Sequence, residues 1–187
     1  IQDLVLYDIV KYALDDGKRL RSVLTIIIGE SICKDVNIEK LSICVELLHN
    51  ASLIIDDMPC MDNDKYRRGK ETIHYKYGQV KAQMLVAYFI KKAFQLLHDN
   101  YCELLNIKKQ NDGNQDITNL SKIFLKISRN INNNLGFLGA ASGQFIDTCP
   151  MNKLIEEQSY KKYYADLDNI LNLIYLKTTT FFEIGFV

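Results

Sequence analysis

Apolar residues recur at three- and four-residue steps along most of the chain, which is the period of an amphipathic helix. The pattern is clearest where Ile38, Leu41, Val45 and Leu48 lead up to Asp56. Side chains three and four positions apart share one helix face, so these residues form an apolar stripe. The spacing predicts one long, mostly buried helix that ends at Asp56.

Further helical patterns follow along the rest of the chain. A second stretch runs from about Ile73 to Leu105, a polar segment covers 106–119, and helical spacing resumes over 120–147 and from Lys153 onward. We interpret the polar segment as a solvated connection. The second stretch is apolar on almost every side, which is typical of a helix inside a large bundle. Its apolar residues are Met84, Leu85, Tyr88, Phe89, Phe94, Leu96 and Leu97.

Composition agrees with a helical fold and bounds its size. The 187 residues include 48% hydrophobic side chains, enough for one substantial core, so we expect a single domain over residues 1–187. Only two prolines and nine glycines are present, whereas an all-β protein of this length needs many turn residues. The predicted fold class is therefore all-α.

Charge and cysteine content exclude several classes of function. Lys and Arg number 23 and Asp and Glu also number 23, so no global field attracts nucleic acid or an acidic membrane surface. The five cysteines lack a CxxC spacing, which argues against a zinc site and against a complete disulfide framework. The longest apolar run, residues 23–28, is too short for a transmembrane segment. We expect a cytoplasmic protein, or a plastid protein if a leader was removed.

Acidic and basic residues gather directly after the long predicted helix. Four carboxylates occupy nine residues, at Asp56, Asp57, Asp62 and Asp64. Clustered carboxylates repel one another unless cations join them, and Mg²⁺ prefers such oxygen ligands. Arg67 and Arg68 follow, and arginines bind phosphate through paired donors. These residue types indicate a site for a magnesium-bound diphosphate. The simplest alternative is a solvated loop at a helix end. A calcium loop of the EF-hand type is excluded because its glycine and terminal Glu are missing.

Four segments in a fixed order extend this interpretation. Residues 47–78 read LLHNASLIIDDMPCMDNDKYRRGKETIHYKYG, preceded by GKRLR at 17–21 and followed by GQFID at 143–147 and KT at 177–178. Together they resemble the motifs of the trans-isoprenyl diphosphate synthases, which make farnesyl and geranylgeranyl diphosphates. The longest segment is similar to the first aspartate-rich motif of that family. The resemblance implies an isoprenoid synthase-type bundle of long helices around a central cavity.

The resemblance also implies a role for each matching residue. Asp56 and Asp62 would hold Mg²⁺, and Asp57 would act beside them as a bridging or supporting carboxylate. The residues that would bind the diphosphate of isopentenyl diphosphate are Lys18, Arg21, His49 and Arg68. The residues that would bind the allylic diphosphate are Arg67, Gln144, Lys177 and Thr178. The residues that would assist catalysis by stabilising charge and orienting the reacting groups are Lys177, Gln144 and Asp147.

The implied activity is a Mg²⁺-dependent condensation of isopentenyl diphosphate with dimethylallyl, geranyl or farnesyl diphosphate. Ser52 and Ala51 lie four and five residues before Asp56, where farnesyl-making relatives carry an aromatic side chain that closes the cavity. Two small residues leave that floor open, so the expected product is geranylgeranyl diphosphate with some farnesyl diphosphate. The family further implies a homodimer.

Two other functions fit part of the pattern. A non-catalytic partner subunit of a prenyl diphosphate synthase would share the fold, although it would not need the carboxylate cluster. A terpene cyclase would need no isopentenyl diphosphate site, and Lys18, Arg21 and His49 argue for such a site. The sequence ends at Val187, before the second aspartate-rich motif of the family. We therefore expect that the C-terminal part of the domain is missing, and the alternative is an incomplete synthase.

Overall fold

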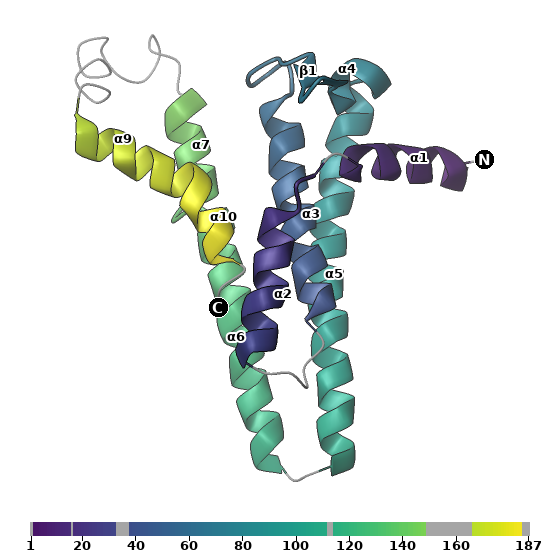
Figure 1. The fold of residues 1–187 in the computed structure, drawn as a ribbon, viewed down its shortest axis with the longest axis vertical. Helices are drawn as coiled ribbons and strands as arrows, with labels where there is room; N and C mark the ends of the chain where they lie inside the picture. Colours follow the sequence, from purple (N-terminus) through teal and green to yellow (C-terminus); the bar gives the residue numbers. More distant parts are fainter. Residues whose placement is uncertain (1, 16, 33–37, 112–113, 149–165, 185–187) are drawn as a thin grey trace. The chain divides into compact units, whose positions relative to one another are not determined.

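Figure 1 shows the computed structural model, which describes residues 2–15, 17–32, 38–111, 114–148 and 166–184. The chain divides into two compact units, Ile1–Asn106 and Ile107–Val187, and each is described by itself. The described parts of both units are almost entirely helical, which confirms the predicted all-α class. The expectation of a single domain stays a prediction.

The first unit is built around a pair of packed helices, α2 and α3. Its elements are α1 (Gln2–Leu14), α2 (Leu20–Ile32), α3 (Glu39–Asp56), β1 (Tyr66–Arg67), β2 (Lys70–Glu71), α4 (Ile73–Tyr77) and most of α5 (Gln79–Asn111). The Ser22 hydroxyl joins α2 to α3, because it lies 3.0 Å from the carbonyl oxygen of Ser42 and 2.9 Å from Oε2 of Glu46. These contacts hold the start of α2 against the middle of α3.

Helix α3 confirms the predicted long helix. Val45 and Leu48 of its apolar stripe are only 1% and 3% exposed. The helix ends at Asp56, and Pro59 follows, which lacks the backbone N–H that a longer helix would need. Because the apolar face is fixed in the core, the polar side chains on the rest of α3 take defined directions.

The predicted helix over residues 73–105 is interrupted. Helix α4 ends at Tyr77, and Gly78 takes φ +92°, a left-handed conformation that L side chains rarely adopt. Helix α5 then begins at Gln79. The apolar pattern could not reveal this break, because a glycine is also tolerated inside a helix.

Only one face of α5 is buried, which differs from the expected burial on nearly every side. Leu85 and Phe89 are almost completely enclosed, at 2% and 0% exposed. Met84 is 64% exposed and Phe94 is 36% exposed. The opposite face of α5 is therefore apolar and open in this chain.

A short β-hairpin lies between α3 and α4 and was not predicted. Its two strands pair in antiparallel register, with Arg67 opposite Lys70. The loop residues Arg68 and Gly69 have φ values of +53° and +80°. Two positive φ angles in a two-residue loop are the geometry of a type I′ turn, whose backbone twist suits a hairpin. The turn therefore fixes the direction in which the Arg68 side chain extends from the backbone.

The second unit is a smaller group of helices. Its described elements, beside the end of α5, are α6 (Asn114–Leu135), α7 (Ala140–Thr148), α9 (Leu167–Ile174), the π-helix η1 (Tyr175–Thr179) and α10 (Thr180–Glu183). The expected solvated connection over 106–119 is wrong, because α5 continues to Asn111 and α6 already begins at Asn114. Lys and Gln in this segment favour a helix where apolar spacing fades. None of the helices among the described residues is long and apolar enough to span a membrane.

Candidate active site

The turn after α3 carries the predicted metal carboxylates. The backbone N–H of Asp62 donates to the carbonyl oxygen of Asp56 at 2.9 Å, so the turn brings Asp62 back to the helix end. Asp56 is half-buried and Asp62 is exposed. Across the described ranges, no three His, Cys, Asp or Glu side chains stand together as a group that could hold a metal ion. The site therefore offers a pair of carboxylates rather than a complete set of protein ligands.

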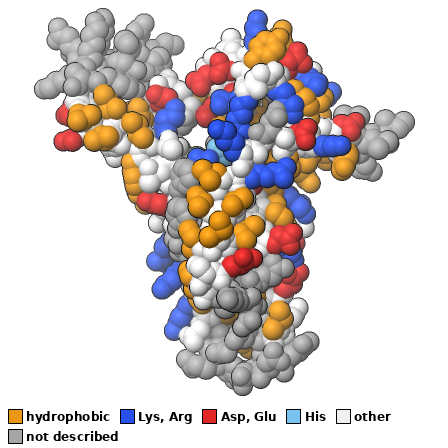
Figure 2. All heavy atoms as spheres, viewed as in Figure 1, with side chains coloured by type: hydrophobic (Ala, Val, Ile, Leu, Met, Phe, Trp, Pro, Cys, Tyr) orange, Lys and Arg blue, Asp and Glu red, His pale blue; other side chains and the backbone are white. Residues whose placement is uncertain are grey.

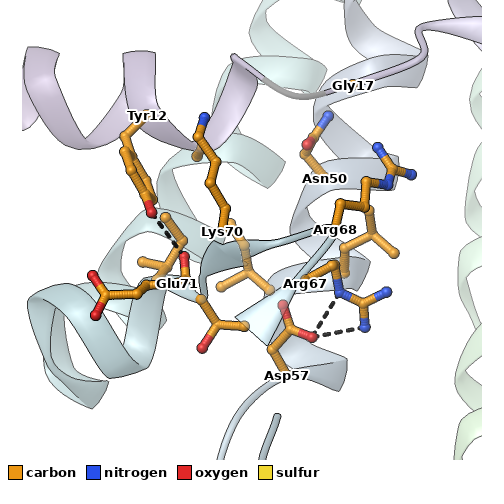
Figure 3. A pocket seen from close by; sticks show the side chains of 13 residues that line it. Tyr12, Gly17, Asn50, Asp57, Arg67, Arg68, Lys70 and Glu71 are labelled. Atoms are coloured by element: carbon orange, nitrogen blue, oxygen red, sulfur yellow. Dashed lines mark hydrogen bonds and ion pairs between the residues drawn. The ribbon is translucent and has the colours of Figure 1, made fainter. Parts of the chain in front are cut away.

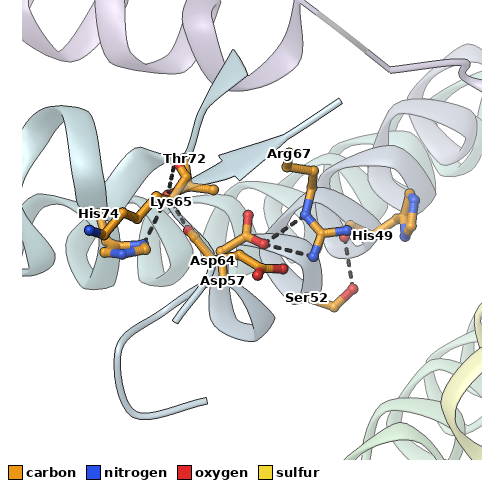
Figure 4. Close-up of polar contacts among 8 residues, drawn as sticks. All are labelled: His49, Ser52, Asp57, Asp64, Lys65, Arg67, Thr72 and His74. Carbon is orange, nitrogen blue, oxygen red and sulfur yellow. Dashed lines mark hydrogen bonds and ion pairs between the residues drawn. The ribbon is translucent and has the colours of Figure 1, made fainter. Parts of the chain in front are cut away.

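Asp57 is engaged by an arginine. It is 5% exposed, and its Oδ1 lies 2.7 Å from both Nε and Nη2 of Arg67 (Figure 4). Burial raises the pKa of Asp57 although Arg67 opposes that shift, and the hydrogen bond to Asp57 raises the pKa of Arg67. Asp57 thus holds Arg67 in place, and its role as a bridging or supporting carboxylate beside the metal stays a prediction.

Thr72 fixes the base of the hairpin. It is 4% exposed, its hydroxyl donates to the carbonyl oxygen of Asp64 at 2.7 Å, and its backbone N–H donates to that of Lys65 at 2.9 Å. Nδ1 of His74 lies 3.1 Å from the same hydroxyl (Figure 4). These bonds tie the aspartate-bearing turn to the strand that follows it.

His49 contacts Arg21, and the charges of Arg68 and Arg67 also act on it. Nη1 of Arg21 lies 3.0 Å from Nε2 of His49, and because arginine can only donate, the neutral ring carries its proton on Nδ1. Burial and then the charges of Arg21, Arg68 and Arg67 lower the pKa of His49 to about 4. Figure 2 shows Lys and Arg side chains gathered on this part of the first unit, beside a histidine. Positive charge concentrated around a neutral, half-buried ring favours binding of an anion.

The connection from α1 to α2 contributes Lys18, and the first turn of α2 contributes Arg21. Lys18 is exposed, whereas burial lowers the pKa of Arg21. A Cβ at Gly17 would lie 2.9 Å from Oε1 of Glu46 on α3. The glycine therefore allows the connection to pass close to α3, which brings Arg21 to His49.

A pocket lies beside these charged groups (Figure 3). Asp57, Arg67 and Arg68 line part of it, together with Tyr12 and Lys70. Tyr12 and Lys70 were not predicted as site residues. The available signal for Lys70 was its place two residues after Arg68, and for Tyr12 its position five residues before Gly17.

The second unit holds the other predicted site residues. Lys177, in η1, forms an ion pair with Asp147 of α7. A Cβ at Gly143 would lie 2.9 Å from Cγ and 3.0 Å from the backbone nitrogen of Lys177, so only glycine permits this close packing of α7 on η1. A π-helical turn is rare in proteins, and where one occurs it often lies at a functional site. Gln144 is half-buried and Thr178 is exposed.

The two predicted chain-length residues differ in their surroundings. Ala51 is 1% exposed. Ser52 is half-buried, and its hydroxyl donates to the carbonyl oxygen of His49 at 2.8 Å (Figure 4). Both are small side chains on α3 within two turns of Asp56, and their role in product length stays a prediction.

Comparison with known protein families identifies the family to which the chain belongs. The family model described as polyprenyl synthetase matches residues 3–186. The chain belongs to the polyprenyl synthetase family. This confirms the resemblance carried by the four sequence motifs. All predicted site residues fall within the matched range.

Named relatives and a solved structure agree with this assignment. A farnesyl diphosphate synthase of Buchnera aphidicola subsp. Schizaphis graminum is 36% identical over 173 residues, which cover 90% of this chain and 51% of that protein. A geranylgeranyl diphosphate synthase of Pantoea ananas is 36% identical over 139 residues, which cover 72% of this chain and 40% of that protein. The crystal structure of a geranyltransferase from Legionella pneumophila superposes with a TM-score of 0.73 and 27% identity, over 97% of this chain and 56% of that one. The isoprenoid synthase-type fold is thus confirmed, and the chain spans about half the length of these proteins.

Proposed function

We propose that the protein is a prenyltransferase that condenses isopentenyl diphosphate with an allylic diphosphate. The observation that carries the proposal is that Arg21 contacts His49 while Arg67 and Arg68 line one pocket with Asp57. Asp56 lies near enough to act on Arg67 electrostatically, so cationic and carboxylate groups share one site. The names of the two relatives support the same class of activity.

Two diphosphates require two sets of cations. We assign the diphosphate of isopentenyl diphosphate to Lys18, Arg21, His49 and Arg68 on the sequence resemblance, and the contact between Arg21 and His49 supports this set. We assign the allylic diphosphate to Arg67, which Asp57 holds in place. For Gln144, Lys177 and Thr178 this role rests on the sequence resemblance alone. An arginine that is held in place by a carboxylate loses less freedom when it binds a phosphate.

The donor set of the turn fits Mg²⁺. In proteins Mg²⁺ is commonly bound by one or two carboxylates and completed by substrate phosphates and water. Asp56 and Asp62 would supply those carboxylates. When bound, the ion would neutralise charge on the leaving diphosphate.

The chain's own groups have distinct tasks in the reaction. Arg67 binds and orients the allylic diphosphate, whose C–O bond must ionise, and its charge stabilises the departing group. The sequence resemblance implies the same task for Lys177. Asp147 orients Lys177 through their ion pair. Gln144 offers an amide carbonyl dipole to the allylic cation without a nucleophile that could capture it. The released diphosphate can accept the final proton, so no side-chain base is required.

The product is proposed to be geranylgeranyl diphosphate, with some farnesyl diphosphate. Ala51 and Ser52 lie roughly 6 to 8 Å from Asp56 along a helix that rises about 1.5 Å per residue, which places them below the reacting carbons. Both side chains are too small to close a cavity at that depth. Replacing Ser52 by Phe should shorten the product to farnesyl diphosphate, and chromatography of the dephosphorylated products checks this. An unchanged product in both Ser52→Phe and Ala51→Phe would remove these positions from the chain-length mechanism.

We also propose a homodimer that uses the open face of α5. Val80 and Met84 are 70% and 64% exposed, one helical turn apart, and Ile90 and Phe94 continue this apolar face. A contiguous apolar surface of this kind is typical of a contact between proteins. Sedimentation should give twice the monomer mass. A fully active monomer at micromolar concentration would contradict this assembly.

The proposed activity is tested by removing the carboxylates and cations separately. Asp56→Ala and Asp62→Ala should each abolish Mg²⁺-dependent condensation while leaving the circular dichroism spectrum unchanged. Lys18→Ala and Arg21→Ala should chiefly raise the KM for isopentenyl diphosphate. Wild-type rates in both aspartate variants would overturn the metal assignment, and an effect confined to the allylic substrate would reverse the two cation sets.

A further inference from the structure

The last turn of α1 is joined to the hairpin through Tyr12. The Tyr12 hydroxyl donates to the carbonyl oxygen of Glu71 in β2 at 3.0 Å (Figure 3). Its ring also meets the ring of Tyr77 edge-on, with centroids 5.4 Å apart. Tyr12 is therefore held both by a polar bond and by an aromatic contact.

Two lysines add to this contact. Nζ of Lys76 and Nζ of Lys70 lie 3.8 Å and 4.7 Å from the centroid of the Tyr12 ring. A cation within about 6 Å of an aromatic centroid is attracted to the ring. Lys70 also lies 3.6 Å from Asp15, which follows α1. Lys70 is thus contacted by the ring of Tyr12 and by the carboxylate of Asp15.

The residues around Tyr12 connect two cationic segments of one site. Lys70 is the direct strand partner of Arg67, and Arg68 lies in the loop between them. In the other direction along the chain, the segment with Lys18 and Arg21 begins directly after α1. Movement at Tyr12 would therefore change the spacing between Arg68 and the Lys18–Arg21 segment.

We propose that Tyr12 is a positioning residue that sets the spacing between these two halves of the isopentenyl diphosphate site. The proposal rests on the function proposed above. The allylic site should depend less on Tyr12, because Arg67 has a second anchor at Asp57 on α3. Tyr12 therefore acts mainly on the binding of the nucleophilic substrate.

Two substitutions in the whole polypeptide separate the parts of this contact. Tyr12→Phe removes only the hydroxyl and should raise the KM for isopentenyl diphosphate roughly two- to tenfold, the effect of one lost hydrogen bond. Tyr12→Leu also removes the ring and should raise it further. In both variants kcat and the KM for the allylic diphosphate should stay within about twofold of wild type. Tyr7→Leu is the matched control, since Tyr7 lies on the same helix and is 63% exposed.

The outcomes distinguish this inference from the proposed function. Equal rises in both KM values, or a fall in kcat alone, would reduce Tyr12 to general support of the fold and overturn the inference. So would unchanged kinetics in Tyr12→Leu. A wild-type protein without condensation activity would refute the proposed function instead. In that case calorimetric titration with inorganic diphosphate still tests the positioning role of Tyr12. Weaker binding in Tyr12→Phe than in wild type supports this role, and equal binding overturns it.

Discussion

Two nitrogens of Arg67 contact the same carboxylate oxygen of Asp57, since Nε and Nη2 both lie 2.7 Å from Oδ1. The carboxylate is almost fully buried, whereas about a third of the Arg67 side chain is exposed. One of the three predicted metal carboxylates is therefore committed to an arginine. The guanidinium is held in a fixed direction while part of it stays open to a ligand.

Replacing Asp57 by Asn should release Arg67. Asn keeps the shape of the side chain but not the charge, so a buried arginine contact loses its counterion, and the free energy of unfolding should fall by about 1 to 3 kcal/mol. The KM for the allylic diphosphate should rise because Arg67 is no longer oriented. Chemical denaturation and steady-state kinetics measure the two effects. Asp8→Asn, at an exposed position of α1, is the control, and equal behaviour of the two variants would contradict the role given to Asp57.

His49 should make stability depend on pH. Burial, and then the charges of Arg21 of α2 and of Arg68 and Arg67 of the hairpin, lower its pKa from 6.5 to about 4 in the folded protein. Below pH 6.5 the unfolded chain takes up a proton that the folded chain refuses, so this contribution to stability falls as the pH drops toward 4 and levels off below it. The loss should be on the order of 2 to 3 kcal/mol.

Denaturation at several pH values checks this linkage. His49→Gln should lose the additional pH dependence between 6.5 and 4, whereas His98→Gln, at an exposed position of α5, should keep it. Bound diphosphate should raise the pKa of His49, because the anion offsets the arginine charges. Identical pH slopes in wild type and His49→Gln would show that neither burial nor the arginine charges shift the pKa of this ring.

The hairpin loop should tolerate Asn but not Ala at position 69. Gly69 has φ +80°, and a Cβ there would meet no atom within 4 Å, so the cost of Ala is backbone strain alone. That strain is about 1 kcal/mol, and it should displace Arg68 and raise the KM for isopentenyl diphosphate. Asn adopts left-handed conformations more readily, so Gly69→Asn should remain close to wild type. Equal kinetics of the Ala and Asn variants would argue against a turn-imposed position of Arg68.

Gly143→Ala should separate Lys177 from Asp147. The added methyl would lie 3.0 Å from the backbone nitrogen of Lys177, and relief of this overlap requires α7 and η1 to move apart. Overpacking of this kind costs about 1 to 3 kcal/mol. We expect a lower melting temperature and, well below it, a reduced kcat. Ala141→Ser, at an exposed position of α7, should change neither, and an unaltered kcat in Gly143→Ala would remove the packing constraint from the mechanism.

The sequence predicted what depends on local pattern. Helix α3 followed from its apolar spacing, and the group of Asp56, Asp57 and Asp62 followed from residue chemistry near the helix end.

Features that depend on contacts between distant segments were not predicted. The hairpin around Arg68 and Gly69 lacks the alternating apolar residues that signal strands. It is closed by hydrogen bonds from Thr72 to the backbone carbonyl oxygens of Asp64 and Lys65. Tyr12 reaches Glu71 across 59 positions of the chain, a distance that no periodicity encodes. The pairing of Asp57 with Arg67 required the fold, because sequence proximity alone grouped Asp57 with the other carboxylates.

The most direct test of the central claim follows the label of radiolabelled isopentenyl diphosphate. The whole polypeptide is incubated with this substrate, Mg²⁺ and dimethylallyl, geranyl or farnesyl diphosphate in turn, and the dephosphorylated products are separated by chromatography. We predict that label enters a geranylgeranyl product with each allylic substrate, and that chelation of Mg²⁺ stops its incorporation. A folded protein that incorporates no label, or that converts an allylic diphosphate to a cyclic product without isopentenyl diphosphate, would contradict the account.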